Sequence, residues 1–135
     1  MAERNTVQKA LVYGALLRLA NHPTADMVYD AVHETNPTIS RATVYRVLGR
    51  LAEKGMILRV EVTGGADHFD HQTHPHYHIF CRRCGRVCDV GMETIAGLES
   101  RITDDAGYKV MGYTVLFDGL CPDCIGKGES VERVP

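Results

Sequence analysis

The chain has 135 residues with ordinary proportions of hydrophobic (44%) and charged (24%) residues, typical of a soluble globular protein of one medium or two small domains. Its apolar runs are shorter than the roughly 20 residues that span a bilayer, and its first ten residues lack the apolar core of a signal peptide. The composition therefore excludes a membrane protein, and we expect a cytoplasmic location in which the cysteines stay reduced.

The formal net charge of −2 is divided unevenly along the chain. Residues 1–60 carry eight Lys and Arg against five Asp and Glu, a balance of +3. Residues 61–135 carry seven against twelve, a balance of −5. The first part is mildly basic and the second acidic, a contrast too small to identify a partner by itself.

Two amphipathic helices are predicted first. Apolar residues recur at helical spacing in VQKALVYGALLRLAN, and Asn21 ends that helix. The second helix opens at Pro23 or Thr24 and carries one apolar face. Pro37 closes this part of the chain.

The third helix is indicated most clearly, by TISRATVYRVLGRLAEKGMI, in which Ser40 is a natural N-cap and Gly55 a helix stop. Two short strands, ILRVEV and GGADHFD, follow and are joined by a Gly-Gly turn. Three helices and a two-stranded ribbon are the layout of a winged helix-turn-helix. The outward face of the third helix carries side chains that suit base edges and phosphates, or that are simply solvated: Arg41, Thr43, Tyr45, Arg46 and Arg50.

A small β-rich module is predicted after about residue 71. YHIFC and RVCDV are β-type runs, METIAGLESRITDDAG has helical spacing, and YKVMGYTVLFDGLC resumes as a strand. Such a small β-β-α-β module gains buried surface by dimerisation. The predicted fold class is α+β, with a winged-helix domain at 1–70, a hinge at 71–76, an α/β dimerisation and metal-binding domain at 77–127, and a disordered tail at 128–135.

Two Cys-x-x-Cys pairs lie on predicted tight turns, Cys81 with Cys84 and Cys121 with Cys124. Two such pairs can place four thiolates at the corners of a tetrahedron, which Zn²⁺ prefers in a closed structural site. The alternative is two separate redox dithiols, which need a thioredoxin-like βαβ setting that the sequence does not contain. The spacing therefore predicts a zinc site within the second module.

A His-x-His pair, His76 and His78, precedes the first cysteine pair. Residues i and i+2 of a strand project to one face, so both imidazoles can meet one ion. Asp89 lies on the expected partner strand and can point to the same side. Two histidines and a carboxylate suit Fe(II), Mn(II) or Zn(II). The same triad would also serve a non-haem iron oxygenase, which would need a substrate cavity around the metal.

The remaining cysteine and histidines are not assigned as ligands by spacing. Cys88 is predicted to face away from its two neighbours as a small buried apolar side chain. His33 is expected to be solvated on a helix. His68, His71 and His74 form either an accessory metal site or part of a solvated hinge.

Several motifs occur in one order along nearly the whole chain: R-x-T-x-Q at Arg4, Thr6 and Gln8, HPTAD at 22–26, ISRATVYRVLGRLAEKGMI at 39–57, FD at 69–70, HYHIFCRRCGRV at 76–87, Asp89, and CPDC at 121–124. Together they resemble the ferric uptake regulator family, and most of all its peroxide-responsive repressors. One departure is the short segment before R-x-T-x-Q, which leaves little room for the extra helix that many members place there.

The resemblance implies a metal-dependent transcriptional repressor, not an enzyme, that binds a palindromic double-stranded DNA operator as a homodimer. It implies a structural Zn²⁺ on the four paired cysteines and a regulatory Fe²⁺ or Mn²⁺ at the domain junction. Carried over position by position, the regulatory ligands are His22, Asp70, His76, His78 and Asp89.

Aspartate at position 89 looks like the peroxide-sensing branch, because iron-uptake members typically carry glutamate there. In that branch Fe(II) reacts with hydrogen peroxide and a ligand histidine is oxidised, which points to His22 and His76 here. The alternatives are an iron or other metal-uptake regulator without peroxide sensing, and a zinc-stabilised interaction module without DNA binding.

Overall fold

The computed structural model describes residues 2–126, with side chains from residue 5 onward, so the predicted tail at 128–135 lies outside the described residues. The chain divides into two compact units, and the boundary falls between His74 and Pro75. None of the helices within residues 2–126 combines the length and the apolar character that crossing a bilayer requires.

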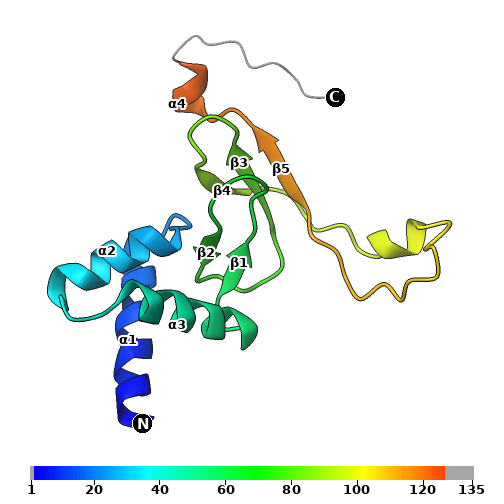
Figure 1. Ribbon diagram of the computed structural model, residues 1–135. Coiled ribbons are helices and arrows are strands. Elements are labelled where there is room, and N and C mark those ends of the chain that lie inside the picture. The colour runs from blue at the N-terminus through cyan, green and yellow to red at the C-terminus, as the bar shows by residue number, and fades with distance from the viewer. Residues whose placement is uncertain (1, 127–135) are drawn as a thin grey trace. The chain divides into compact units, whose positions relative to one another are not determined.

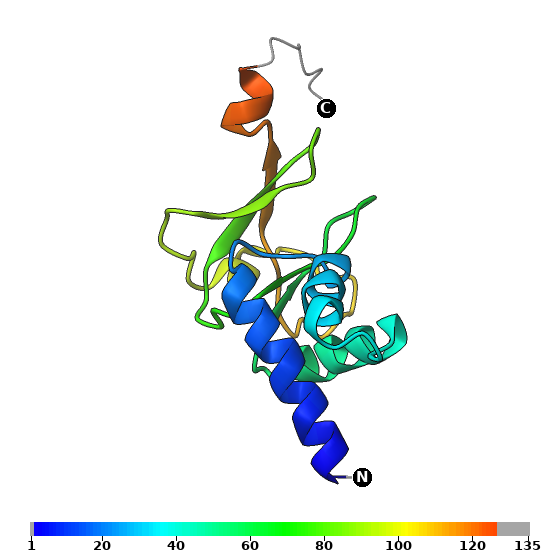
Figure 2. The same cartoon turned by 90° about the vertical axis from the view of Figure 1, so that its left-hand side faces the viewer.

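The first unit is three helices followed by an antiparallel two-stranded ribbon (Figure 1). Each helix packs on the other two, as Figure 2 also shows. The winged-helix prediction is confirmed, and the first helix begins earlier than its apolar run indicates. The elements are α1 (Ala2–Leu19), α2 (Ala25–Thr35), α3 (Arg41–Glu53), β1 (Leu58–Val60) and β2 (His68–Asp70).

Local capping sets where α2 and α3 begin. The hydroxyl of Thr24 accepts a hydrogen bond from the Met27 N–H (3.2 Å), and the hydroxyl of Ser40 accepts one from the Thr43 N–H (3.1 Å). Each bond satisfies a backbone donor that the first turn leaves without a helical partner. After α3, Gly55 takes the left-handed conformation (φ +73°), which a glycine adopts without a steric penalty.

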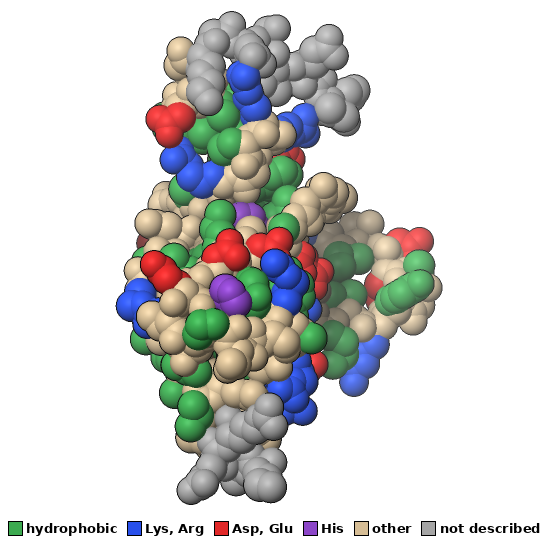
Figure 3. Space-filling view, turned by 60° about the vertical axis from the view of Figure 1, so that its left-hand side comes forward, with side chains coloured by type: hydrophobic (Ala, Val, Ile, Leu, Met, Phe, Trp, Pro, Cys, Tyr) green, Lys and Arg blue, Asp and Glu red, His purple; other side chains and the backbone are tan. Residues whose placement is uncertain are grey.

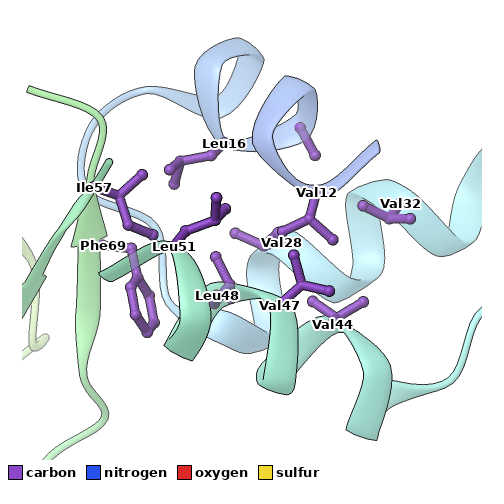
Figure 4. Close-up of a cluster of buried hydrophobic side chains, with 11 residues drawn as sticks. Val12, Leu16, Val28, Val32, Val44, Val47, Leu48, Leu51, Ile57 and Phe69 are labelled. Carbon is purple, nitrogen blue, oxygen red and sulfur yellow. The ribbon is translucent and has the colours of Figure 1, made fainter. Parts of the chain in front are cut away.

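A single apolar core holds the first unit together. Valines and leucines of the three helices point toward a common centre, and Ile57 and Phe69 close it from the ribbon side (Figure 4). The fully buried side chains include Val12 and Leu16 of α1, Val28 of α2, and Val44 and Leu48 of α3. This packing gives α3 a rigid support.

The second unit is a three-stranded sheet in the order β4-β3-β5, in which β3 runs antiparallel to β4 and parallel to β5 (Figure 1). A 3₁₀ turn, η1 (Leu98–Arg101), lies between β4 and β5, and a short helix follows β5. The remaining elements are β3 (Tyr77–Cys81), β4 (Val87–Val90), β5 (Leu116–Gly119) and α4 (Pro122–Ile125).

Two predictions for the second unit are wrong. The helix expected over METIAGLESRITDDAG is reduced to η1, and the strand expected over YKVMGYTVLFDGLC is formed only by β5. Ile95, Leu98 and Ile102 define the helical spacing; Ile95 and Ile102 are 41% and 46% exposed and Leu98 is half-buried, so the described residues cover the expected apolar face only in part. A short helix without tertiary packing is marginal in water, and Gly97 adds a left-handed backbone (φ +69°) where η1 begins.

Few apolar side chains are buried in the second unit. Among residues 75–126, the buried ones are Tyr77, Cys81, Val87 and Cys124, two of which are cysteines. Figure 3 shows hydrophobic side chains at the surface of the segment between β4 and β5. A module with so small a core needs a metal or a partner surface to be stable. Its exposed large hydrophobic residues are Met92, Ile95, Ile102, Tyr108, Val110, Met111, Tyr113, Phe117 and Ile125.

Neighbouring leucines of α1 test the position of the core. Leu16 is fully buried, whereas Leu17 is 44% exposed. We expect Leu16→Ala to lower the free energy of unfolding by about 2–5 kcal/mol, because it leaves a cavity among the helices. Leu17→Ala should cost less than about 1 kcal/mol. Urea unfolding of both variants, followed by far-ultraviolet circular dichroism, measures this difference, and equal losses would contradict the described core.

Candidate metal centres and nucleic-acid interface

Four cysteine thiols gather at one end of the sheet in the second unit, and their sulfur atoms all lie within 4.8 Å of one another. The Sγ atoms of Cys84 and Cys121 are 3.7 Å apart. Zn–S bonds of 2.3 Å in a tetrahedron place sulfur atoms roughly 3.8 Å apart. The donor set and its spacing therefore fit Zn²⁺. This four-thiol cluster comprises Cys81, Cys84, Cys121 and Cys124.

Backbone hydrogen bonds shape both cysteine turns. Cys81 ends β3, and its carbonyl accepts the N–H of Gly85 (2.9 Å), whose left-handed backbone (φ +79°) closes the first turn. Cys121 is the N-cap of α4, so Cys124 returns one turn later. Arg86 and Asp123 form an ion pair between the two turns (Nη1–Oδ2, 3.3 Å).

The thiols differ in how easily they ionise. Burial disfavours the Cys81 thiolate, but the N–H groups of Cys84 (3.5 Å) and Cys121 (3.4 Å) donate to its sulfur, and the pKa of Cys81 falls to about 6. Burial, together with the neighbouring thiols, raises the pKa of Cys124 to about 12. Four thiolates this close repel one another unless a cation lies between them. The four-thiol cluster is thus chemically suited to a divalent metal.

The prediction that Cys88 is buried is wrong. Cys88 pairs with Ile79 across the β3–β4 ladder, while Asp89 pairs with His78, so Cys88 does face away from Asp89. Its thiol is nevertheless exposed, because Cys88 lines an open hollow with Ile79, Arg86 and Pro122. Cys88 is not among the four clustered thiols.

In the first unit, His22 and Asp70 form a close pair (Nε2–Oδ2, 3.1 Å). Asp70 is 3% exposed at the end of β2, and its second oxygen accepts the N–H of Gln72 (2.9 Å). Ala20, Asn21 and His22 adopt left-handed backbone conformations (φ +46°, +50° and +58°). Such conformations are costly for residues with a Cβ and persist where the surroundings enforce them, often at functional sites.

One backbone and one side-chain contact from β2 hold this left-handed segment. The Phe69 N–H donates to the Pro23 carbonyl (2.8 Å), and the His68 ring nitrogen Nδ1 lies 2.7 Å from the His22 carbonyl oxygen, to which it donates. His68 is therefore a buried supporting residue of His22. Its place two residues before Asp70, on the same face of β2, is the only sequence signal for this role.

In the second unit, His76, His78 and Asp89 converge. Nε2 of His76 lies 3.0 Å from Oδ1 of Asp89, and Nε2 of His78 lies 3.4 Å from the same oxygen. The ring centroids of the two histidines are 4.4 Å apart. The β3–β4 register places His78 directly opposite Asp89. Two nitrogen donors and one carboxylate at a common point suit a transition-metal ion such as Fe(II), Mn(II) or Zn(II).

The surface of α3 carries the residues predicted to contact DNA. Arg41 and Tyr45, one turn apart, both donate to Oδ1 of Asp26 in the first turn of α2. Arg46 is exposed and donates to Gln8 of α1 (3.3 Å). Thr43 is half-buried, and its hydroxyl accepts a hydrogen bond from the Ser40 hydroxyl (2.9 Å). Thr43 therefore contributes to the N-terminal cap of α3.

Positive charge gathers on the other flank of α3. A hollow of about 300 Å³ lies between α1 and α3, and both helices contribute to its walls. Three cationic side chains in one hollow attract phosphate groups. The hollow is lined by Lys9, Arg50 and Lys54, together with Asn5, Thr6, Val47 and Leu51.

Comparison with known proteins decides the family. The model described as "Ferric uptake regulator family" matches residues 2–117. This chain belongs to the ferric uptake regulator family. The peroxide-responsive repressor PerR of Staphylococcus saprophyticus is 32% identical over 127 residues, covering 92% of this chain and 84% of that protein. The peroxide operon regulator of Bacillus subtilis is 32% identical over 127 residues, covering 92% of this chain and 86% of that protein.

A solved structure agrees with this assignment. The Campylobacter jejuni peroxide stress regulator superposes with a TM-score of 0.69 at 27% identity, covering 90% of this chain and 91% of that one. Ferric uptake regulators are metal-responsive, dimeric, DNA-binding transcription regulators. The prediction of a regulator is confirmed, and neither an oxygenase nor a module without DNA binding fits this family.

Two cysteine substitutions test the four-thiol cluster. We expect the purified protein to hold about one equivalent of zinc per chain. Cys124→Ser should abolish this zinc and make residues 75–126 sensitive to protease, because the metal supplements a small apolar core. Cys88→Ser should keep both the zinc and the protection. Elemental analysis and limited proteolysis measure these outcomes, and equal zinc loss in the two variants would contradict the described cluster.

Proposed function

We propose that this ferric uptake regulator is a metal-dependent repressor whose regulatory ion binds side chains of both units. The observation that carries the proposal is that each unit already orients its own donors at a common point. His22 and Asp70 do so in the first unit, and His76, His78 and Asp89 in the second. Three imidazoles and two carboxylates suit Fe(II) or Mn(II).

A shared ion explains how metal binding changes DNA affinity. The expected hinge at 71–76 lies between Asp70 and His78 in the sequence, and the unit boundary falls within it. Once the side chains of both units bind the same ion, the hinge loses its freedom. We call the arrangement in which donors of both units bind one ion the closed arrangement. Because the ion binds this arrangement preferentially, it shifts the population toward the conformation that binds DNA.

Homodimerisation is supported by the hydrophobic residues between β4 and β5 that the described part of the chain leaves exposed. A second copy would cover them and supply the burial that this unit lacks. A dimer carries two α3 helices related by a two-fold axis, and these match two half-sites of a palindromic operator. We propose Arg41, Thr43, Tyr45 and Arg46 as the DNA contacts and Zn²⁺ as the ion of the four-thiol cluster.

We further propose that hydrogen peroxide is the signal. The relatives named as peroxide-responsive repressors, and aspartate at position 89, support this. A bound Fe(II) would supply the chemistry that reduces hydrogen peroxide, the two-electron oxidant, so that one peroxide oxygen leaves as water and the other is inserted into a ligand imidazole. The ligand imidazoles of His22 and His76 are the proposed targets, and gaining an oxygen atom weakens their nitrogen donors. Loss of these donors frees the hinge and releases the operator.

Metal dependence can be tested with matched histidine variants. Mn(II) should raise the affinity of the wild type for a duplex selected from a random pool by about 5–150-fold, the usual range of such coupling. His78→Ala should abolish this increase because it removes a donor. His74→Ala, an exposed histidine outside the proposed ligands, should retain it. Fluorescence anisotropy with and without metal measures both, and equal affinity of metal-free and Mn(II)-loaded wild type would overturn the proposal.

Peroxide sensing has its own test. Fe(II)-loaded protein treated with hydrogen peroxide should gain one oxygen atom on His22 or His76, and the Mn(II)-loaded protein should not. Peptide mass spectrometry locates the added atom, and His33 on α2 is the internal control. If no oxygen is found on either ligand histidine while metal-dependent DNA binding persists, the protein is a metal sensor without peroxide sensing.

A further inference from the structure

Asp26 occupies an unexpected place beside the proposed DNA contacts. It lies in the first turn of α2, where the helix dipole stabilises a carboxylate, and it is exposed. One of its oxygens accepts hydrogen bonds from both Arg41 and Tyr45 of α3. An acidic side chain on the proposed DNA-binding surface repels phosphates. The contacts of Asp26 with Arg41 and Tyr45 therefore suggest that Asp26 has a role in DNA recognition.

The direction of the Tyr45 hydrogen bond is chemically informative. A phenol has one proton, and Tyr45 directs it to Asp26. This hydrogen bond with Asp26 raises the pKa of Tyr45, as expected for a phenol that donates its proton to a carboxylate. The Arg41 guanidinium also donates a hydrogen bond to the Tyr45 hydroxyl oxygen, so Tyr45 presents to solvent its ring and the remaining lone pair of that oxygen. In the major groove, acceptors recognise the amino groups of adenine and cytosine, and apolar surfaces recognise the thymine methyl group.

Arg41 is held from two sides. Its guanidinium donates to Asp26 and lies over the ring of Tyr29, 4.4 Å from the centroid. Tyr29 is in turn stacked on His33, with centroids 5.2 Å apart. Arg41 is thus paired with a carboxylate and packed on an aromatic ring, while 54% of its side chain stays exposed. Arg46, by contrast, donates only to the neutral amide of Gln8 in the contacts described.

We infer that Asp26 is a specificity-determining positioning residue of the DNA interface. Asp26 accepts the Tyr45 hydroxyl proton, so this hydroxyl does not donate to phosphates and Tyr45 discriminates between bases instead. Asp26 also restrains Arg41 from contacting phosphates independently of the DNA sequence. This inference rests on the proposed DNA-binding role of α3. Asp26 touches no nucleic acid itself and acts through Tyr45 and Arg41.

Three variants separate these effects. Asp26→Ala removes both the acceptor and the charge, whereas Asp26→Asn removes the charge and keeps an acceptor oxygen for Tyr45. Asp30→Asn removes an equal charge one turn further along α2 and is the matched control. Asp26 and Asp30 are exposed, so all three variants should unfold at nearly the wild-type temperature.

The experiment compares Mn(II)-loaded proteins on two probes, a duplex selected by the wild type and a random-sequence duplex, over a range of salt concentrations. Asp26→Ala should bind the random duplex more tightly, steepen the salt dependence by about 0.9 in the log–log slope, and lower the specificity ratio about tenfold. Asp26→Asn should share the steeper slope but retain most of the specificity ratio. Asp30→Asn should keep the wild-type ratio.

Tyr45→Phe completes a double-mutant cycle. It should lower the specificity ratio in the wild type and cause little further loss in Asp26→Ala, because both changes remove the same oriented hydroxyl. The inference would be overturned if the Asp26 and Asp30 substitutions changed the specificity ratio equally. It would also be overturned if the losses of specificity caused by Asp26→Ala and Tyr45→Phe were additive. Failure of the wild type itself to bind DNA with any metal would instead overturn the proposed function of α3.

Discussion

Cys81 is the residue on which the second unit depends. It ends β3, contributes to the four-thiol cluster, and accepts N–H groups from both cysteine turns. The N–H of the next residue, Arg82, bonds the carbonyl of Gly119 at the end of β5. Holding Cys81 therefore fixes the register of β3 against its neighbours. His78 lies three residues earlier on the same strand, opposite Asp89, so the four-thiol cluster positions donors of the proposed regulatory site.

The first unit shows a similar division between support and recognition. A continuous apolar core holds α3 rigidly, while the two flanks of α3 differ in charge. On one flank the cations line a hollow against α1. On the other, the Asp26 carboxylate restrains Arg41 and Tyr45. Under the proposed function, the first flank supplies affinity through phosphates and the second limits it to particular bases.

Local chemistry explains which features could be predicted from the sequence. The N-caps and the Gly55 stop depend on neighbouring residues, so α2 and α3 were predictable. The His78–Asp89 contact follows from strand pairing across one tight turn, and His76, two residues before His78, reaches the same carboxylate. The pairing of His22 with Asp70 does not, because it depends on a left-handed segment held by β2, and only the family resemblance suggested it. The helix expected over METIAGLESRITDDAG is not formed, since the described residues cover its apolar face only in part. Asp26 was missed because an exposed acid early in a helix is ordinary.

Under the proposed function, one regulatory ion and the operator both favour the same arrangement of the two units and are therefore coupled. Coupling of this kind is reciprocal by thermodynamic necessity. The decisive measurement is the dissociation constant of Mn(II) without and with saturating operator duplex. The account predicts that the operator tightens Mn(II) binding by the same factor by which Mn(II) tightens operator binding. An Mn(II) affinity that is unchanged by the operator would contradict it.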